Sequence, residues 1–153
     1  MVSKRWVWAF VASGGIASAV AAGTAWAGGP GGTVEDTPAD LFAAVGSGTF
    51  EDFQDGVGRN GFEAGFTATG PTAEAAQAAV IAACQAAGGV DCTADEYTNA
   101  NLCIVSVFDP VSHVAAGGAG PTVEAARLDA IGRAAANGTP LPADAAVLIS
   151  SCP

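Results

Sequence analysis

The heptapeptide GPTAEAA at residues 70–76 returns as GPTVEAA at residues 120–126. In each copy the glycine and proline end an extended segment, and the threonine is a helix N-cap residue. The glutamate follows in the first turn, where the helix dipole favours a negative charge. The runs that follow are rich in alanine and end at Gly88-Gly89 and at Asn137-Gly138, which are typical helix C-caps. The sequence therefore predicts two alanine-rich helices, one in each copy of a duplicated unit.

Apolar segments flank both predicted helices. Phe50 and Phe53, followed by residues 62–69, indicate a hairpin whose turn uses Asn60-Gly61, since this pair adopts positive φ readily. Residues 102–108 and 114–119 indicate a second hairpin, and residues 145–152 a last strand. We expect an α+β fold in which two repeated β-hairpin-α-β units, about 49–103 and 104–153, form one antiparallel sheet covered by the two helices and linked by disulfides.

The glycines at positions 56, 58 and 61 match the spacing of the dinucleotide-binding fingerprint. That fingerprint binds phosphate only where a strand precedes it and a helix begins at its last glycine. Here a strand is predicted to follow the last glycine. We therefore assign these glycines to the hairpin turn and predict no cofactor.

The N-terminal residues have the pattern of a secretory signal peptide. Lys4 and Arg5 precede an apolar run over residues 6–22, and Ala25-Trp26-Ala27 is a small-residue cleavage site. We predict cleavage near Ala27, release to the cell envelope or the extracellular space, and no membrane insertion after cleavage. Residues 28–48 are expected to be a flexible acidic, glycine-rich segment with a short helix that begins at Thr37-Pro38.

The chain is strongly acidic, with fifteen Asp and Glu against five Lys and Arg and a net charge of −10. Without residues 1–27 only three arginines remain against all fifteen acidic residues, a net charge of −12. Binding to nucleic acid depends on neutralising phosphates with Lys and Arg. We therefore predict no nucleic-acid partner, and instead a monomer with an unknown protein partner.

Four cysteines, at positions 84, 92, 103 and 152, all follow the predicted cleavage site. They lack the close pairs that zinc knuckles use, so we predict no metal and, in an exported chain, two disulfides. Four cysteines allow three pairings. A local Cys84–Cys92 bridge with Cys103–Cys152 is favoured, and the second bridge would link the two units. The pairing of Cys84 with Cys103 and of Cys92 with Cys152 stays open.

These features resemble the exported bacterial family known as domain of unknown function 4189. The resemblance lies in the helix starts TAEAA at 72–76 and TVEAA at 122–126, in Cys84 at a helix end and in Cys103 at the entry to an apolar strand. It implies export and a duplicated fold, and it implies no reaction. The chain departs from the pattern at Ala134, where a second helix-end cysteine would be expected.

No residue cluster predicts a catalytic site. Ser106 or Ser112 with His113 and Asp109 could supply the groups of a serine hydrolase, but no nucleophile elbow accompanies them. A solvated hairpin turn is the simpler interpretation of His113. We therefore predict no catalytic residues.

We expect a non-enzymatic protein-interaction module at the bacterial envelope or in the host environment. Loops carry binding residues more often than regular elements do, and three candidate loops cover residues 55–61, 91–101 and 138–144. An alternative is a small secreted hydrolase or carbohydrate-active enzyme that uses the carboxylates of the second loop. The candidate interaction residues are Asp55, Arg59, Asn60, Asp91, Asp95, Glu96 and Tyr97.

Overall fold

The computed structural model describes residues 25–26, 41–54 and 57–153, with side chains for residues 41–51 and 61–153. Within these ranges it contains two helices and seven strands of very different length. In chain order they are β1 (Ala25–Trp26), β2 (Phe42–Gln54), β3 (Val57–Gly70), α1 (Ala73–Ala86), β4 (Val90–Thr98), β5 (Cys103–Asp109), β6 (Val114–Gly120), α2 (Val123–Ala136) and β7 (Ala146–Ser151).

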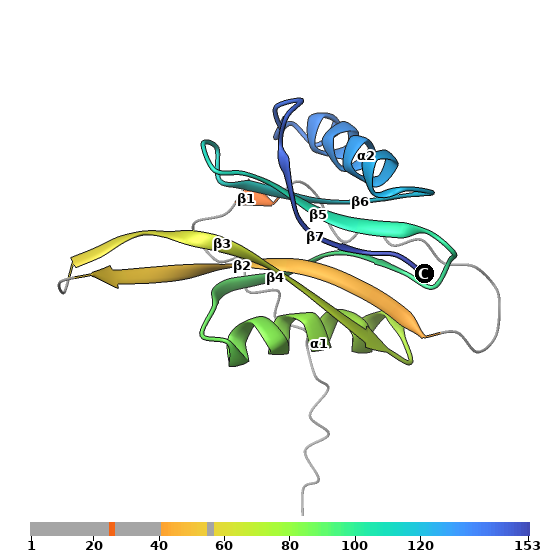
Figure 1. Cartoon of the computed structure of the whole chain (residues 1–153), viewed down its shortest axis with the longest axis horizontal. Helices are drawn as coiled ribbons and strands as arrows, with labels where there is room; N and C mark the ends of the chain where they lie inside the picture. Colours follow the sequence, from red (N-terminus) through yellow and green to blue (C-terminus); the bar gives the residue numbers. More distant parts are fainter. Residues whose placement is uncertain (1–24, 27–40, 55–56) are drawn as a thin grey trace, which may run out of the picture.

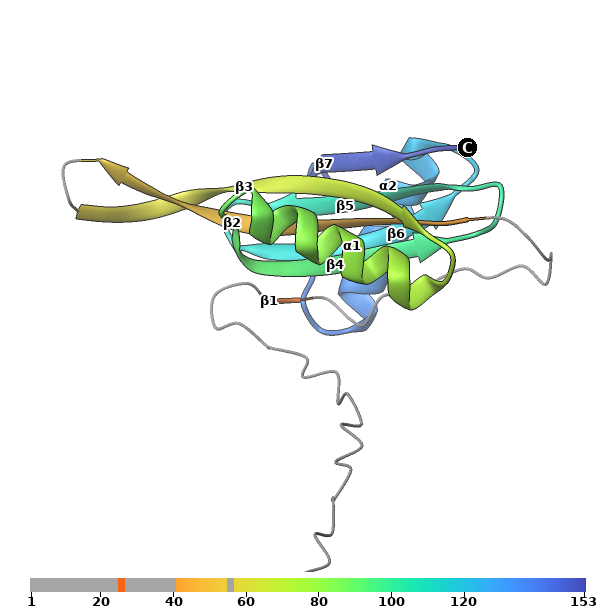
Figure 2. The same cartoon turned by 90° about the horizontal axis from the view of Figure 1, so that it is seen from below.

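The strands form two sheets rather than the single sheet that the sequence predicted. The first sheet has the order β3-β2-β4, and the second has the order β6-β5-β7 with the short β1 parallel to β6. Apart from β1, all pairings are antiparallel. The sheets face each other, with α1 on the outer face of the first and α2 on the outer face of the second (Figures 1 and 2). The α+β class is confirmed, and its layers run helix, sheet, sheet, helix.

Strand β6 can contact both β4 of the first sheet and its own helix α2, because most of its residues are glycine or alanine. A Cβ atom added at Gly117 would stand 1.9 Å from the carbonyl oxygen of Asp95 in β4. One added at Gly118, on the other face of the strand, would stand 2.2 Å from the carbonyl oxygen of Ala126 in α2. Two adjacent glycines therefore let β6 contact the opposite sheet on one side and its own helix on the other. The two sheets thus meet face to face instead of edge to edge.

Both helices begin where the repeated motif predicts. Thr72 accepts a hydrogen bond from the amide of Ala75 and Thr122 accepts one from the amide of Ala125, each at 3.1 Å. These bonds satisfy one of the free amides of each first turn. The buried positions of each helix are four residues apart and so share one face; they are Ala76, Val80 and Cys84 in α1, and Ala126, Ala130 and Ala134 in α2.

Two local predictions near the N-terminus are wrong. Residues 42–45, expected in a short helix that stops at Gly46, and residues 46–48, expected in the flexible segment, belong to β2, while residues 37–40 lie outside the described ranges. Asn60-Gly61 is not a turn, because Phe50 pairs with Phe62 and Asp52 pairs with Arg59. Two residues of β3 therefore stand opposite one residue of β2, which is a β-bulge. In both places strand pairing with distant residues outweighs the local signal.

The favoured disulfide pairing is confirmed. Cys84 bonds to Cys92 and Cys103 bonds to Cys152, with Cα–Cα distances of 5.9 Å and 4.1 Å. The expected role of the second bridge is wrong, however. Cys103 is the first residue of β5 and Cys152 directly follows β7, so this bridge closes the second sheet on itself. No disulfide among the described residues links the two sheets, so apart from the polypeptide chain itself they are held together by non-covalent contacts.

The predicted signal peptide lies outside the described residues, except for the two residues of β1. In the described part of the chain, neither helix is long and apolar enough to cross a membrane.

Candidate functional site

The predicted loop over residues 91–101 is largely a strand, and its candidate residues point to different places. Val45 pairs with Glu96 and Gly46 pairs with Ala94, so Asp95 is the extra residue of a bulge. This bulge lets two adjacent carboxylates, those of Asp95 and Glu96, both be buried. Their contacts, described below, are with β5 and with α2, so these carboxylates are not exposed as those of a binding loop would be.

Asp91 and Tyr97, the other candidates of this segment, are half-buried. Tyr97 packs on the α1 side of the first sheet, with its ring centroid 6.4 Å from that of Phe42. Asp91 has a φ of 52°, a left-handed conformation that aspartate adopts more readily than most residues. The structure therefore does not bring Asp91 and Tyr97 together with the buried Asp95 and Glu96 in one site.

Asp95 lies among hydroxyl groups. Thr93 donates a hydrogen bond of 2.7 Å to its Oδ1 atom, and the buried Ser106 of β5 donates one of 2.5 Å to its Oδ2 atom. Ser47 of β2 extends the cluster through a 3.3 Å contact with the Thr93 hydroxyl. Charge-assisted hydrogen bonds of this kind offset the cost of burying a carboxylate. Ser106 is thus an internal partner of Asp95 rather than an exposed nucleophile.

Glu96 is fully buried and forms an ion pair with Arg133 of α2. Arg133 also contacts Asp129 at 2.6 Å, and Asp129 accepts a hydrogen bond of 2.9 Å from the amide of Ala119 in β6. These polar contacts therefore connect α2 with β6 through Asp129 and with β4 through Arg133. Sequence spacing could not have indicated this contact, because Glu96 and Arg133 are 37 residues apart.

Glu63 of β3 is a half-buried carboxyl at the edge of the same hydroxyl cluster. Thr49 donates a 3.0 Å hydrogen bond to its Oε2 atom, while its buried Oε1 atom accepts none from the described residues. Burial raises the pKa of Glu63 above its ordinary value, the hydrogen bond from Thr49 opposes this in part, and the charges of Asp95 and Asp91 raise it further.

We expect Glu63→Gln to remove a pH-dependent loss of stability. Because the pKa of Glu63 is raised in the folded state, the unfolded chain loses this proton first as the pH rises. The free energy of unfolding should therefore fall from about pH 4.5 upward, until the folded carboxyl has also ionised. Urea titrations between pH 3 and pH 8 should show the variant equal to the wild type at the acidic end and more stable at the neutral end.

A suitable control is Glu51→Gln, which neutralises an exposed carboxylate of the same hairpin. This variant should follow the wild-type pH profile. Parallel profiles for the wild type and Glu63→Gln would contradict the assignment of the titration to Glu63.

Asp109 stabilises the turn after β5 by hydrogen bonds. Together with Ser112 and His113 it does not have the geometry of a catalytic triad. The Asp109 carboxylate accepts 2.6 Å and 2.9 Å hydrogen bonds from the hydroxyl and the amide of Ser112, which lower the pKa of Asp109. Aspartate and serine are thus bonded directly, with no histidine between them. His113 is exposed, has a φ of 55° and lies edge-on to the ring of Phe108.

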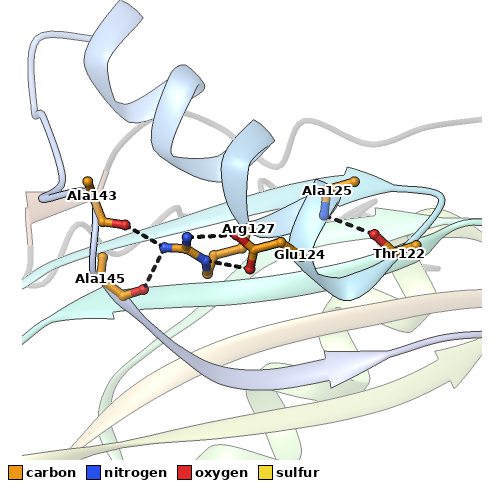
Figure 3. A network of polar contacts seen from close by, with 6 residues as sticks. All are labelled: Thr122, Glu124, Ala125, Arg127, Ala143 and Ala145. Atoms are coloured by element: carbon orange, nitrogen blue, oxygen red, sulfur yellow. Dashed lines mark hydrogen bonds and ion pairs between the residues drawn. The ribbon is translucent and has the colours of Figure 1, made fainter.

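The third predicted loop, residues 138–144, is irregular as expected, and α2 holds its end in place. Arg127 pairs with Glu124 and donates hydrogen bonds of 2.8 Å and 3.3 Å to the carbonyl oxygens of Ala143 and Ala145 (Figure 3). Leu141 of the same segment is buried. These contacts fix the loop against α2.

A surface cavity of about 240 Å³ lies beside the Cys103–Cys152 bridge. Its walls are Leu41 and Ala43, residues 98–102, and residues 151–153. Among these lining residues none has an ionisable side chain, so their side chains offer the cavity amide and hydroxyl groups. Nor do any three His, Cys, Asp or Glu side chains of the described chain form a group that could hold a metal ion.

The predicted loop at 55–61 belongs mostly to a projecting hairpin. The last pairing of β4 joins Val90 to Thr49, so beyond Thr49 strand β2 pairs with β3 alone. We call this two-stranded part, residues 50–54 and 57–62, the arm; it extends beyond the body of the molecule (Figures 1 and 2). Arg59 and Asn60 lie in the arm by their backbone, and Asp55 lies outside the described residues.

Three phenylalanines stack on one face at the base of the arm, and we call them the aromatic patch. The rings of Phe50 and Phe62 are 5.3 Å apart at an interplanar angle of 12°, and those of Phe50 and Phe66 are 6.0 Å apart at 25°. Phe62 is 62% exposed. The sequence predicts strands for these residues but does not predict the patch. Only the register between β2 and β3 brings Phe50 opposite Phe62.

No family model, curated protein or solved structure matches this chain. The resemblance to domain of unknown function 4189 therefore stays a prediction.

Proposed function

We propose that this chain is an exported, non-enzymatic protein-interaction module that binds its partner through the arm and its aromatic patch. The observation that carries this proposal is the 62% exposure of Phe62 within a stack of three phenylalanines. Exposed aromatic clusters are typical of protein interfaces, where such side chains supply most of the binding energy.

The comparison of the two hairpins supports this choice of surface. Strands β2 and β3 have 13 and 14 residues, whereas β5 and β6 have seven each. The shorter hairpin suffices to cover a helix and to pair with a third strand. None of the arm's described side chains belongs to the buried core, so core packing by these side chains does not account for the extra length.

The carboxylates that suggested a hydrolase support this alternative less well. Asp95 and Glu96 are buried and engaged with Ser106 and Arg133, and the cavity beside the second disulfide is lined by neither of them. A general acid or base must reach its substrate. We therefore base the proposed function on the arm.

We propose, further, that β2–β3–α1–β4 and β5–β6–α2–β7 are two copies of one ancestral unit. The two sheets share one strand order, in which the third strand pairs with the first. Thr72 and Thr122, fifty residues apart, make the same capping contact at the same 3.1 Å distance. The two disulfides are compatible with an oxidising, exported location.

Phe62→Ser should abolish capture of the natural partner. The full chain, immobilised and incubated with secreted and envelope extracts of its source cells, should retain a partner that Phe62→Ser does not retain. Leu128→Ser is the matched control, because Leu128 is 56% exposed on α2, far from the arm (Figure 1). A partner retained equally by wild type and Phe62→Ser would contradict the proposed function.

A further inference from the structure

The aromatic patch continues a face of the first sheet that α1 covers only in part. Phe66 lies in the cluster that packs under α1. At Gly48 an added Cβ would stand 2.1 Å from the Cys84 sulfur, which marks the end of α1's coverage along β2. Phe50 follows two residues later on the same face. The apolar surface therefore extends from beneath α1 onto a stretch of the arm that no described helix covers.

The arm has little support of its own. Beyond Thr49 it is a two-stranded ribbon, and such ribbons are marginally stable in water unless another element packs on them. A helix already packs on this same face at α1. A second helix that continued the layer of α1 would bury Phe50 and Phe62 in the same way.

The net charge of the chain indicates which kind of partner could bind the aromatic patch. The chain has a net charge of −10, and Glu51, next to the patch, is exposed. Two of its five basic residues, Arg127 and Arg133, already form ion pairs within the fold. A second copy of the chain would carry the same excess of negative charge and be repelled, whereas a basic segment would be attracted.

From this geometry and charge we propose that the occupant of the aromatic patch is an amphipathic helix of another protein, with apolar residues on one face and Lys or Arg beside them. This inference rests on the proposed function and names the chemistry of its partner. Apolar side chains of the helix would pack on Phe50 and Phe62, and its basic side chains would be attracted by the excess negative charge of the chain.

The test uses two synthetic helical peptides of about 18 residues, or five turns, that share a leucine face. One has lysine and the other has glutamate at its polar positions. Isothermal titration against the full oxidised chain should show binding of the Leu/Lys peptide that weakens with salt, and no binding of the Leu/Glu peptide. Phe62→Ser should weaken binding by about tenfold or more, and Leu128→Ser should leave it unchanged.

Three outcomes would overturn this inference. Binding of the Leu/Lys peptide that is unaffected by Phe62→Ser would place it elsewhere on the acidic surface. Equal binding of both peptides would remove the role of charge. Sedimentation that shows a dimer of the wild type, lost in Phe62→Ser, would make a second copy the occupant.

The proposed function and the proposed chemistry of the partner can be disproved separately. If Phe62→Ser abolishes capture of the natural partner while the Leu/Lys peptide does not bind, the arm is an interaction site and its partner chemistry is wrong. If Phe62→Ser changes neither measurement, both the proposed function and this inference are wrong. Circular dichroism of the variant should match the wild type, since Phe62 is largely exposed.

Discussion

Replacing Cys103 and Cys152 together by alanine is expected to lower the free energy of unfolding by about 4 kcal/mol. The bridge closes a loop with a sequence separation of 49 residues, and the entropy that such a loop removes from the unfolded chain corresponds to about 4 kcal/mol at 25 °C. This is a large part of the 5–15 kcal/mol that stabilises a typical domain, so roughly a quarter of the stability or more depends on this bond.

Urea unfolding under non-oxidising, non-reducing conditions, followed by circular dichroism, measures this loss. Replacing Cys84 and Cys92 is the comparison, because their loop spans only 8 residues and corresponds to about 2.5 kcal/mol. The Cys103–Cys152 variant should therefore unfold at the lower urea concentration. Equal midpoints for wild type and that variant would contradict the expectation.

Arg133→Met is expected to destabilise the fold by about 3 kcal/mol. The substitution keeps much of the apolar stem but leaves the fully buried carboxylate of Glu96 without its cation. An uncompensated buried charge costs about 3–5 kcal/mol, and the lower end applies because the Arg133 side chain is 32% exposed. The loss should appear as a lower urea midpoint at pH 7.

A double-mutant cycle separates the ion pair from simple packing. Glu96→Gln in the Arg133→Met background removes the stranded charge, so the double variant should be more stable than Arg133→Met alone. Glu124→Gln, which breaks the exposed pair with Arg127, should change stability little. If Glu96→Gln adds a further loss to Arg133→Met, the contact between the layers does not work through charge.

Features that depend on neighbouring residues could be predicted from the sequence. Thr72 and Thr122 form hydrogen bonds with residues three positions away, so their capping role follows from local spacing. The Cys84–Cys92 bridge is equally local. For these contacts the chain itself fixes the geometry, and the helices and the disulfide pairing were predicted correctly.

Strand β4 could not be predicted, because its burial depends on distant partners. Asp95 and Glu96 have the composition of a solvated loop, and only Ser106 and Arg133 make their burial tolerable. The same reason explains β2, whose first residues follow a helix-start signal yet pair with β3 and β4. The aromatic patch escaped prediction because its existence depends on the register between two strands.

The position of the two bridges makes the molecule covalently divisible. Cys84 and Cys92 both precede residues 99–102, and Cys103 and Cys152 both follow them. One proteolytic cut in this connection would leave two cross-linked fragments with no covalent bond between them, one with β2, β3, α1 and β4 and the other with β5, β6, α2 and β7. The contacts of Asp95 and Glu96 with the second sheet and its helix, the pairing of β1 with β6, and the packing of β3 against β7 at Gly65 and Ile149 would then hold the fragments together. After such a cut the protein would be a non-covalent complex of two fragments, each held by its own disulfide.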